Sequence, residues 1–193
     1  MLKVKEITFA FGKKTVLNNL SLELENGEIL ALMAPSGYGK TTLLGLVAGI
    51  LRPQEGEIEN TFEKVAYVFQ EPRLFPWLTV KENLLAVLDE KDENAEKTVF
   101  DCLEYVGLSD AADKYPDELS GGMKSRASLA RALAYGGDLF LLDEPFAALD
   151  ENLRHNLAEK LKEHLRARGA SAILVTHNKE DAESIADRIL TLS

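Results

Sequence analysis

The chain has very little cysteine: Cys102 is the single one in 193 residues, so an internal disulfide framework is excluded. A lone thiol is typical of proteins that work in a reducing compartment. Long apolar runs are also missing. No stretch reaches the roughly 18 residues of a membrane-spanning helix, and the first residues lack the apolar region of a signal peptide. We therefore expect a cytoplasmic protein.

Basic residues are scarce relative to acidic ones. The 22 lysines and arginines face 32 aspartates and glutamates, which gives a net charge of −10 and a pI of about 4.9. Proteins that hold DNA or RNA usually have a basic surface, because phosphate contacts dominate their affinity. The acidic balance therefore argues against nucleic acid as the main ligand, although a local basic groove for a single nucleotide remains open. The hydrophobic fraction of 46% is that of an ordinary globular domain.

Two kinds of pattern divide the chain. Up to about residue 59, short apolar segments separated by glycine turns predict antiparallel strands and hairpins. Beyond that point helical and strand patterns alternate, which predicts a parallel sheet with crossover helices. Three apolar runs, 29–33, 139–142 and 172–175, are typical of buried parallel strands. Because ligands bind beyond the carboxyl ends of such strands, we expect one site where these runs end.

Two regions are predicted to be helical. Residues 151–167 carry leucines at every fourth position, which indicates one face packed on the core. Residues from about 78 to 133 are expected to form a small helical subdomain within one domain that spans 1–193. The acidic run LDEKDENAEK within that region is typical of a solvated face.

A glycine-rich motif, Ala34-Pro35-Ser36-Gly37-Tyr38-Gly39-Lys40-Thr41-Thr42, follows the first buried run and precedes a helix. It resembles the phosphate-binding P-loop, in which backbone N–H groups and the helix start together hold an anion. Lys40 is expected at the β- and γ-phosphates and the Thr41 hydroxyl at Mg²⁺. The nucleotide contacts expected in this motif are Ser36, Gly37, Tyr38, Gly39, Lys40, Thr41 and Thr42. Ala34 replaces the first glycine of the pattern; if that position requires a positive φ, alanine costs about 1 kcal/mol. A glycine-rich turn without a ligand is the alternative.

Two further segments carry chemistry. Leu119-Ser120-Gly121-Gly122-Met123 precedes a helical stretch, so Ser120 is expected to cap that helix while the glycines expose backbone donors. Taken alone, this segment predicts only a well-capped helix. The run 139–142 ends in Asp143 and Glu144, whose side chains point to opposite sides of a strand. One carboxylate can therefore hold Mg²⁺ while the other polarises an attacking water.

With these three segments in this order, nearly the whole chain resembles the ATP-binding cassette (ABC) ATPases, because LSGGM matches the signature sequence of that family. The resemblance implies an α/β P-loop NTPase cassette. Its expected parts are a RecA-like parallel-sheet core, an N-terminal antiparallel β subdomain and a small helical subdomain. It also implies ATP and Mg²⁺ as cofactors and ATP hydrolysis as the activity.

The resemblance further implies roles for single residues. Phe11 corresponds to the aromatic that stacks on adenine, and Gln70 in YVFQEP to a glutamine that contacts Mg²⁺ and water. Asp150 ends the D-loop match ALD, and His177 in LVTHN matches the switch histidine at the γ-phosphate. From the residues alone, Phe11 fits a core aromatic better and His177 is undecided. The implied catalytic residues are Glu144, His177 and Gln70, and the implied Mg²⁺ ligands are Thr41, Gln70 and Asp143.

In this family two copies assemble head to tail, so the resemblance implies that Ser120, Gly121 and Gly122 of a second copy complete the nucleotide site. The segment PRLFPWLTVKEN, residues 72–83, clusters apolar side chains directly after Gln70. Such a cluster indicates either buried packing or a docking surface for a partner.

The sequence FPWLTVKENL is similar to the corresponding segment of the ATPases of importers for nitrate, sulfonates and taurine. It implies a homodimer bound to a separate transmembrane permease subunit on the inner face of the cell membrane, with a solute-binding protein in the full system. A non-transport ABC ATPase and an ATP-binding regulatory module are the alternatives. A P-loop kinase would not explain the LSGGM, ALD and THN segments together.

Overall fold

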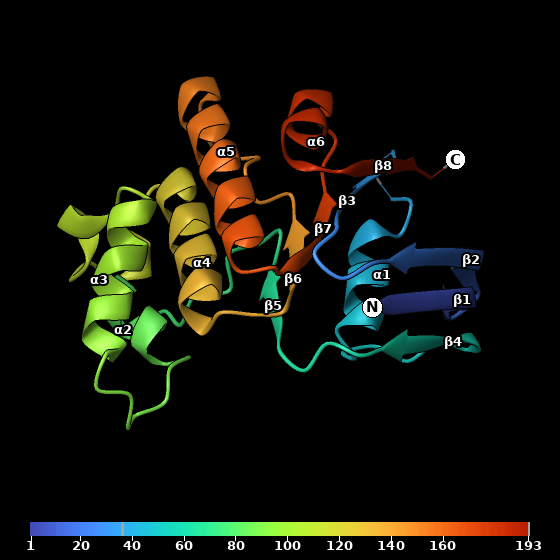
Figure 1. Ribbon diagram of the computed structural model, residues 1–193, viewed down its shortest axis with the longest axis horizontal. Coiled ribbons are helices and arrows are strands. Elements are labelled where there is room, and N and C mark those ends of the chain that lie inside the picture. The colour runs from blue at the N-terminus through green and yellow to red at the C-terminus, as the bar shows by residue number, and fades with distance from the viewer. Residues whose placement is uncertain (36, 193) are drawn as a thin grey trace.

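The computed structural model describes residues 1–35 and 37–192. Ser36, one of the expected nucleotide contacts, and Ser193 lie outside the described residues. Figure 1 shows an antiparallel sheet at one end of the molecule, a group of helices at the other, and a parallel sheet between them.

The antiparallel sheet has the strand order β2-β1-β4. Its strands are β1 (Leu2–Phe11), β2 (Lys14–Leu24) and β4 (Glu55–Asn60). Apolar residues alternate along β1, and Leu2 and Val4 are buried on one face. Glu6 has a φ of 51°, and the pairing register shifts beside it, so the strand bends there. The antiparallel strands expected before residue 59 are confirmed.

The central sheet is parallel and has the strand order β5-β6-β7-β3-β8. Its strands are β3 (Ile29–Met33), β5 (Val65–Val68), β6 (Leu139–Asp143), β7 (Ser171–Val175) and β8 (Arg188–Thr191). The three apolar runs form β3, β6 and β7, which are neighbours in the sheet and run in the same direction. Every residue of β6 and β7 is buried, because both faces of the sheet are covered.

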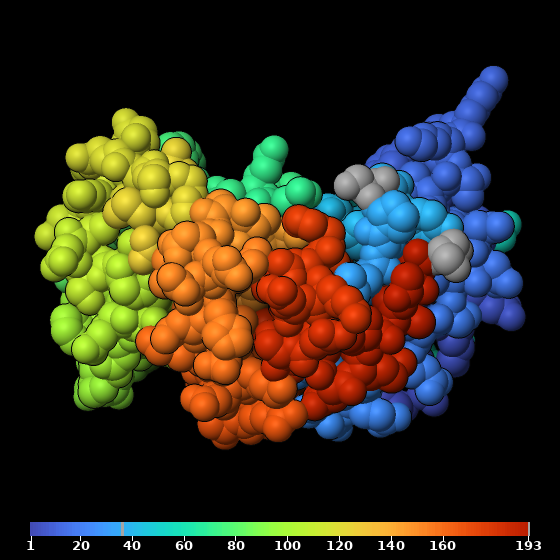
Figure 2. Space-filling model, turned by 90° about the horizontal axis from the view of Figure 1, so that it is seen from above, coloured from blue at the N-terminus to red at the C-terminus, as the bar shows by residue number. Residues whose placement is uncertain are grey.

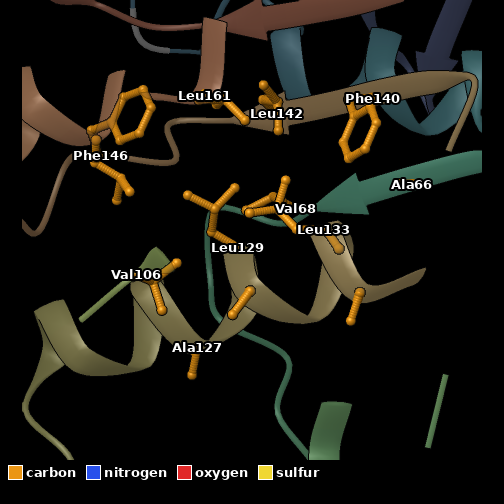
Figure 3. Close-up of a cluster of buried hydrophobic side chains, with 14 of the residues drawn as sticks. Ala66, Val68, Val106, Ala127, Leu129, Leu133, Phe140, Leu142, Phe146 and Leu161 are labelled. Atoms are coloured by element: carbon orange, nitrogen blue, oxygen red, sulfur yellow. The ribbon is translucent and has the colours of Figure 1, made fainter. Parts of the chain in front are cut away.

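Each face of the parallel sheet has its own hydrophobic core. On one face Phe140 and Leu142 of β6 pack against helices α4 (Gly121–Tyr135) and α5 (Glu151–Ala167), where Leu129, Leu133 and Leu161 meet them (Figure 3). On the other face the alternate β6 leucines pack against α1 (Lys40–Val47) and the antiparallel sheet. The segments that follow β3, β6 and β7 therefore continue from strands that are packed on both faces.

The helical group contains α2 (Val80–Leu85), α3 (Ala95–Tyr105) and two short 3₁₀ turns at Ser109–Ala111 and Pro116–Glu118. A capping box of Thr79 and Glu82 starts α2. Helix α4 runs on to Tyr135, and the expected subdomain limit near 133 stays a prediction. Helix α5 matches the expected 151–167, and α6 (Lys179–Ile185) follows β7. Among the described residues no helix is both long and apolar enough to cross a bilayer.

Candidate functional site

Four strands of the parallel sheet end at the same edge, and each is followed by a predicted site residue or motif. The P-loop follows β3, Gln70 follows β5, Glu144 follows β6 and His177 follows β7. A pocket of about 270 Å³ opens there. It is lined by Phe11, Val16, Gly37, Gly39, Lys40, Thr41, Thr42, Gln70, Asp143 and Glu144. The convergence of strand ends expected from the apolar runs is therefore found, with β5 as a fourth contributor.

The P-loop reaches the first turn of α1 through Gly39, which precedes the helix with a φ of 81°. A Cβ at this position would lie 2.7 Å from Val16 Cγ1 and 2.8 Å from Leu17 Cδ2. Glycine is therefore required both by the left-handed backbone and by the closeness of β2. Ala34 does not belong to the non-glycine residues with positive φ, so the strain considered for this alanine is absent.

The Lys40 ammonium lies over its own loop. Its Nζ donates to the carbonyl oxygens of Ala34 at 2.6 Å and Pro35 at 3.0 Å. A phosphate oxygen can take the place of these carbonyl oxygens as the acceptor for the ammonium. The arrangement holds a positive charge at the mouth of the cradle formed by the loop and the start of α1.

Asp143 is 1% exposed, and its Oδ2 accepts a hydrogen bond of 2.7 Å from the Thr41 hydroxyl. Burial, aided by the neighbouring Glu144 carboxylate, raises the pKa of Asp143, while the bond from Thr41 and the charge of Lys40 oppose that rise. Nucleotide-bound Mg²⁺ takes one or two protein carboxylates and completes its shell mainly with phosphates and water. Within the described part of the chain no cluster of three or more His, Cys, Asp or Glu could hold a metal alone. The Thr41–Asp143 pair thus fits a cation brought with phosphates.

Glu144 has a φ of 51°, a left-handed conformation that costs about 1–3 kcal/mol for a residue with a side chain. Its N–H donates to the Val175 carbonyl at 2.9 Å, which fixes this backbone to β7. Its Oε2 lies 2.8 Å from His177 Nδ1, with the glutamate side chain 11% exposed and the histidine 72% exposed. A carboxylate held in this way at the pocket can accept a proton from water or orient it.

The signature segment lies outside this pocket. Ser120 caps α4 by accepting a hydrogen bond of 3.3 Å from the Met123 N–H, as expected. A Cβ on Gly122 would lie 2.8 Å from the Ala148 carbonyl oxygen, so the turn packs closely on the segment before α5. Asp150 caps α5 by accepting a 3.0 Å bond from the Leu153 N–H.

The two aromatic residues of the predicted site, Phe11 and Tyr38, lie in different places. Phe11 is 56% exposed, contacts Phe9 edge to face at 4.9 Å, and lines the pocket, so it is not a core aromatic. Tyr38 lines a neighbouring groove between β2 and β8 and is not among the pocket residues. Val16 of β2 also lines the pocket, although it belongs to none of the predicted site motifs.

The sequence matches the family described as "ABC transporter" over residues 17–147. It is 40% identical to the aliphatic sulfonates import ATP-binding protein of Bacillus licheniformis over 100% of this chain and 79% of that protein. It is 41% identical to an Fe(3+) ions import ATP-binding protein of Haemophilus influenzae over 98% of this chain and 58% of that protein.

Solved structures give the same result for the fold. An ATP-binding cassette, determined as a dimer in a post-hydrolysis state with ADP and phosphate bound, superposes with a TM-score of 0.91. The two are 30% identical, and the match covers 100% of this chain and 94% of that one. The α/β cassette fold expected from the motifs is thereby confirmed.

Proposed function

This chain belongs to the ABC transporter family and is one of its Mg²⁺-dependent ATPases, and we propose that it powers an importer whose permease is a separate chain. One observation carries the assignment of the residues. The P-loop with Lys40, the Thr41–Asp143 pair and the Glu144–His177 pair all meet at one edge of the parallel sheet.

In the proposed mechanism Lys40 and the loop N–H groups bind the β- and γ-phosphates, and Phe11 stacks on the base. Thr41, Asp143 and Gln70 would hold Mg²⁺, which would neutralise part of the phosphate charge when bound. Glu144 orients the attacking water and accepts its proton.

His177 is assigned the γ-phosphate: it does not itself line the pocket, but its ring is exposed and its Nδ1 contacts Glu144, which does. Charge developing on the phosphate oxygens is thereby stabilised by a group that is already oriented.

A second copy of the chain is proposed to complete the site with Ser120, Gly121 and Gly122. Two features support this arrangement. These residues lie outside the pocket of their own chain, and a Cβ on Gly121 would meet no atom within 4 Å, so this face of the turn is open to a partner. The similar cassette with ADP and phosphate is a dimer. Asp150, whose segment contacts the signature turn, is proposed to lie at the same interface.

The permease is proposed to dock on residues 72–83. Trp77 is 69% exposed and Phe75 is 39% exposed, with ring centroids 5.6 Å apart. Two aromatic side chains that are this exposed favour a docking surface over buried packing, which was the alternative for this segment. The buried Asn83 holds the loop in shape, since its side chain bonds the backbone of Phe75 and Leu78. Docking there would place the protein on the inner face of the membrane.

The cargo is proposed to be a small nutrient chosen by the permease and a solute-binding protein. Relatives of about 40% identity are named for two chemically different solutes, aliphatic sulfonates and Fe(3+) ions. A cassette of this sequence is thus compatible with either class.

Replacement of Glu144 tests the proposed chemistry. Glu144→Gln should keep ATP affinity within about twofold and lower kcat at least about 100-fold, because the water loses its proton acceptor. The same variant should form a dimer when ATP is added. Glu159→Gln, on the exposed side of α5, is the control and should hydrolyse ATP normally. Hydrolysis by Glu144→Gln at the parent rate would remove Glu144 from its role.

Docking is tested by co-purification with the co-expressed permease. The double variant Phe75→Ala/Trp77→Ala should bind ATP normally and lose the permease. Phe100→Ala, on α3, removes another exposed aromatic (58% exposed) and should keep the permease. Retention of the permease by the double variant would contradict the docking site.

A further inference from the structure

Helices α5 and α6 both begin near the sheet edge that carries the pocket, and they lie side by side (Figures 1 and 2). Asp150 caps α5, directly after the segment that contacts the signature turn. Asn178 caps α6, directly after His177. A contact between the first turns of these two helices therefore joins the segment before α5 to the histidine that contacts Glu144.

Such a contact is made by Arg154 of α5 and Asp181 of α6. Arg154 Nε lies 3.4 Å from Asp181 Oδ1. Asp181 is 6% exposed, and burial raises its pKa while the charge of Arg154 opposes the rise. A buried carboxylate requires such a partner. Glu180 is 4.0 Å from the same guanidinium but is solvent-exposed, so it contributes little.

Asp181 also lies next to the residues on both sides of His177. The Thr176 side chain opposes the rise in the pKa of Asp181, so its hydroxyl lies close to that carboxylate. The Thr176 hydroxyl oxygen in turn accepts a 3.1 Å bond from the Asn178 N–H. The Asn178 side chain accepts a 3.2 Å bond from the Asp181 N–H. The residues before and after His177 are thus both bonded into one small network with Asp181.

We propose that Arg154 and Asp181 are positioning residues for ATP hydrolysis, which hold the His177 ring against Glu144 and link it to the segment that begins α5. This inference rests on the roles proposed above for Glu144 and His177. Neither positioning residue lines the nucleotide pocket, so their effect is on the rate and not on ATP affinity.

The same two helices offer a matched control. Arg166, near the end of α5, pairs with Asp187, just after α6, at 2.8 Å. This pair joins the same parts of the fold at the end away from the pocket, and its side chains are 57% and 37% exposed. If an ion pair between these segments mattered only for folding, removal of either arginine would have no specific effect on turnover.

The experiment compares Arg154→Met, Asp181→Asn, the double variant and Arg166→Met. Arg154→Met should lower kcat about 10- to 100-fold with KM within twofold, the size expected when a catalytic group is misplaced by about 1 Å. Arg154→Lys should restore only part of the rate, because lysine lacks the planar fork. Arg166→Met should keep the parent kcat.

The double variant separates positioning from stability. It removes the unpaired buried carboxylate, so it should unfold at a higher denaturant concentration than Arg154→Met. Its kcat should nevertheless stay as low as that of either single variant, because both singles break the same link. A double variant that regains both stability and kcat would overturn the proposal.

Nitrogen NMR of the imidazole rings gives a reading that does not depend on turnover. The chain has three histidines, so His177→Ala assigns the His177 signal. That signal should shift in Arg154→Met and Asp181→Asn and stay in place in Arg166→Met. An unshifted His177 signal together with parent kcat in Asp181→Asn would overturn the proposal. If Glu144→Gln or His177→Ala instead hydrolyses ATP normally, the underlying assignment of the site fails.

Discussion

The nucleotide pocket and the signature turn of this chain differ in how well their own polar groups are satisfied. In the pocket, Asp143 is buried beside a second carboxylate and Glu144 has a strained left-handed backbone. In the signature turn, Ser120 makes a regular cap. A bound cation and phosphates can offset the unfavourable free energy of these pocket groups. The signature turn, in contrast, is stable by itself, and its role depends on a second chain.

The largest expected effect is the loss of ATP affinity when a glycine of the P-loop is replaced. Gly39→Ala places a Cβ 2.7 Å from Val16 at a φ of 81°, so the P-loop must move. We expect ATP affinity to fall at least about 100-fold, or about 2.7 kcal/mol, in a binding titration. Gly169→Ala has a φ of 62° and open space around the new methyl group, and should bind ATP as the parent does. Normal affinity in Gly39→Ala would show that the loop does not form the phosphate site.

Gly122→Ala, in the signature turn, should lower the rate of hydrolysis and leave the ATP affinity nearly unchanged. The new Cβ would lie 2.8 Å from the Ala148 carbonyl and shift the signature turn, which is outside the pocket. We expect ATP affinity of the monomer within about twofold of the parent and kcat about 10- to 100-fold lower, because the turn acts on the nucleotide of another copy. Equal loss of affinity in both glycine variants would break the comparison.

The two regions also differ in what the sequence alone predicts. The strands β3, β6 and β7 are continuous apolar runs followed at once by polar motifs, so local pattern and topology together locate the pocket. The LSGGM segment predicts only a capped helix, and its function comes from the family resemblance. Ion pairs such as Arg154–Asp181 have no sequence signal, because two helices far apart in sequence must be packed before their partners are known.

In the loop of residues 72–83, the proposed docking site, one substitution should affect stability and another should not. Asn83 is fully buried, and both its side-chain oxygen and nitrogen bond the loop backbone. Asn83→Ala should lower the free energy of unfolding by about 2 kcal/mol, since the loop groups lose their partners. Trp77→Ala should change it by about 0.5 kcal/mol or less. Denaturant titration measures both, and a larger loss in Trp77→Ala would mean that the tryptophan is packed.

Two features of the pocket were beyond the reach of sequence patterns for a physical reason. Val16 is a half-buried apolar residue of β2 that packs on the hydrophobic core, and the P-loop approaches it closely enough to bring it into the pocket. Phe11 ends β1, where a hydrophobic side chain has the same pattern whether it is covered or open. Whether each of these side chains is covered or lines the pocket depends on the distance between the two sheets, which a strand pattern does not encode.

The smallest expected effect concerns the charge in the pocket. Because the folded-state pKa of Asp143 is raised above its ordinary value of 3.8, the folded state binds more protons than the unfolded state as this carboxyl titrates. The contribution of this group to stability therefore decreases as the pH rises above about 4. Asp143→Asn removes the buried charge but keeps an acceptor for Thr41.

In the absence of nucleotide, Asp143→Asn should melt a few degrees higher than the parent at pH 7, roughly the shift that 1 kcal/mol gives in a domain of this size. The difference should shrink towards pH 4, as the parent carboxyl takes up its proton. Asp181 also has a raised pKa but is present in both proteins, so it cancels from the difference. With ATP and Mg²⁺ the order should reverse, because the parent gains ligand binding that the variant lacks. A variant less stable than the parent at every pH would mean that the carboxylate stabilises the empty pocket, and the contrast with the signature turn would fail.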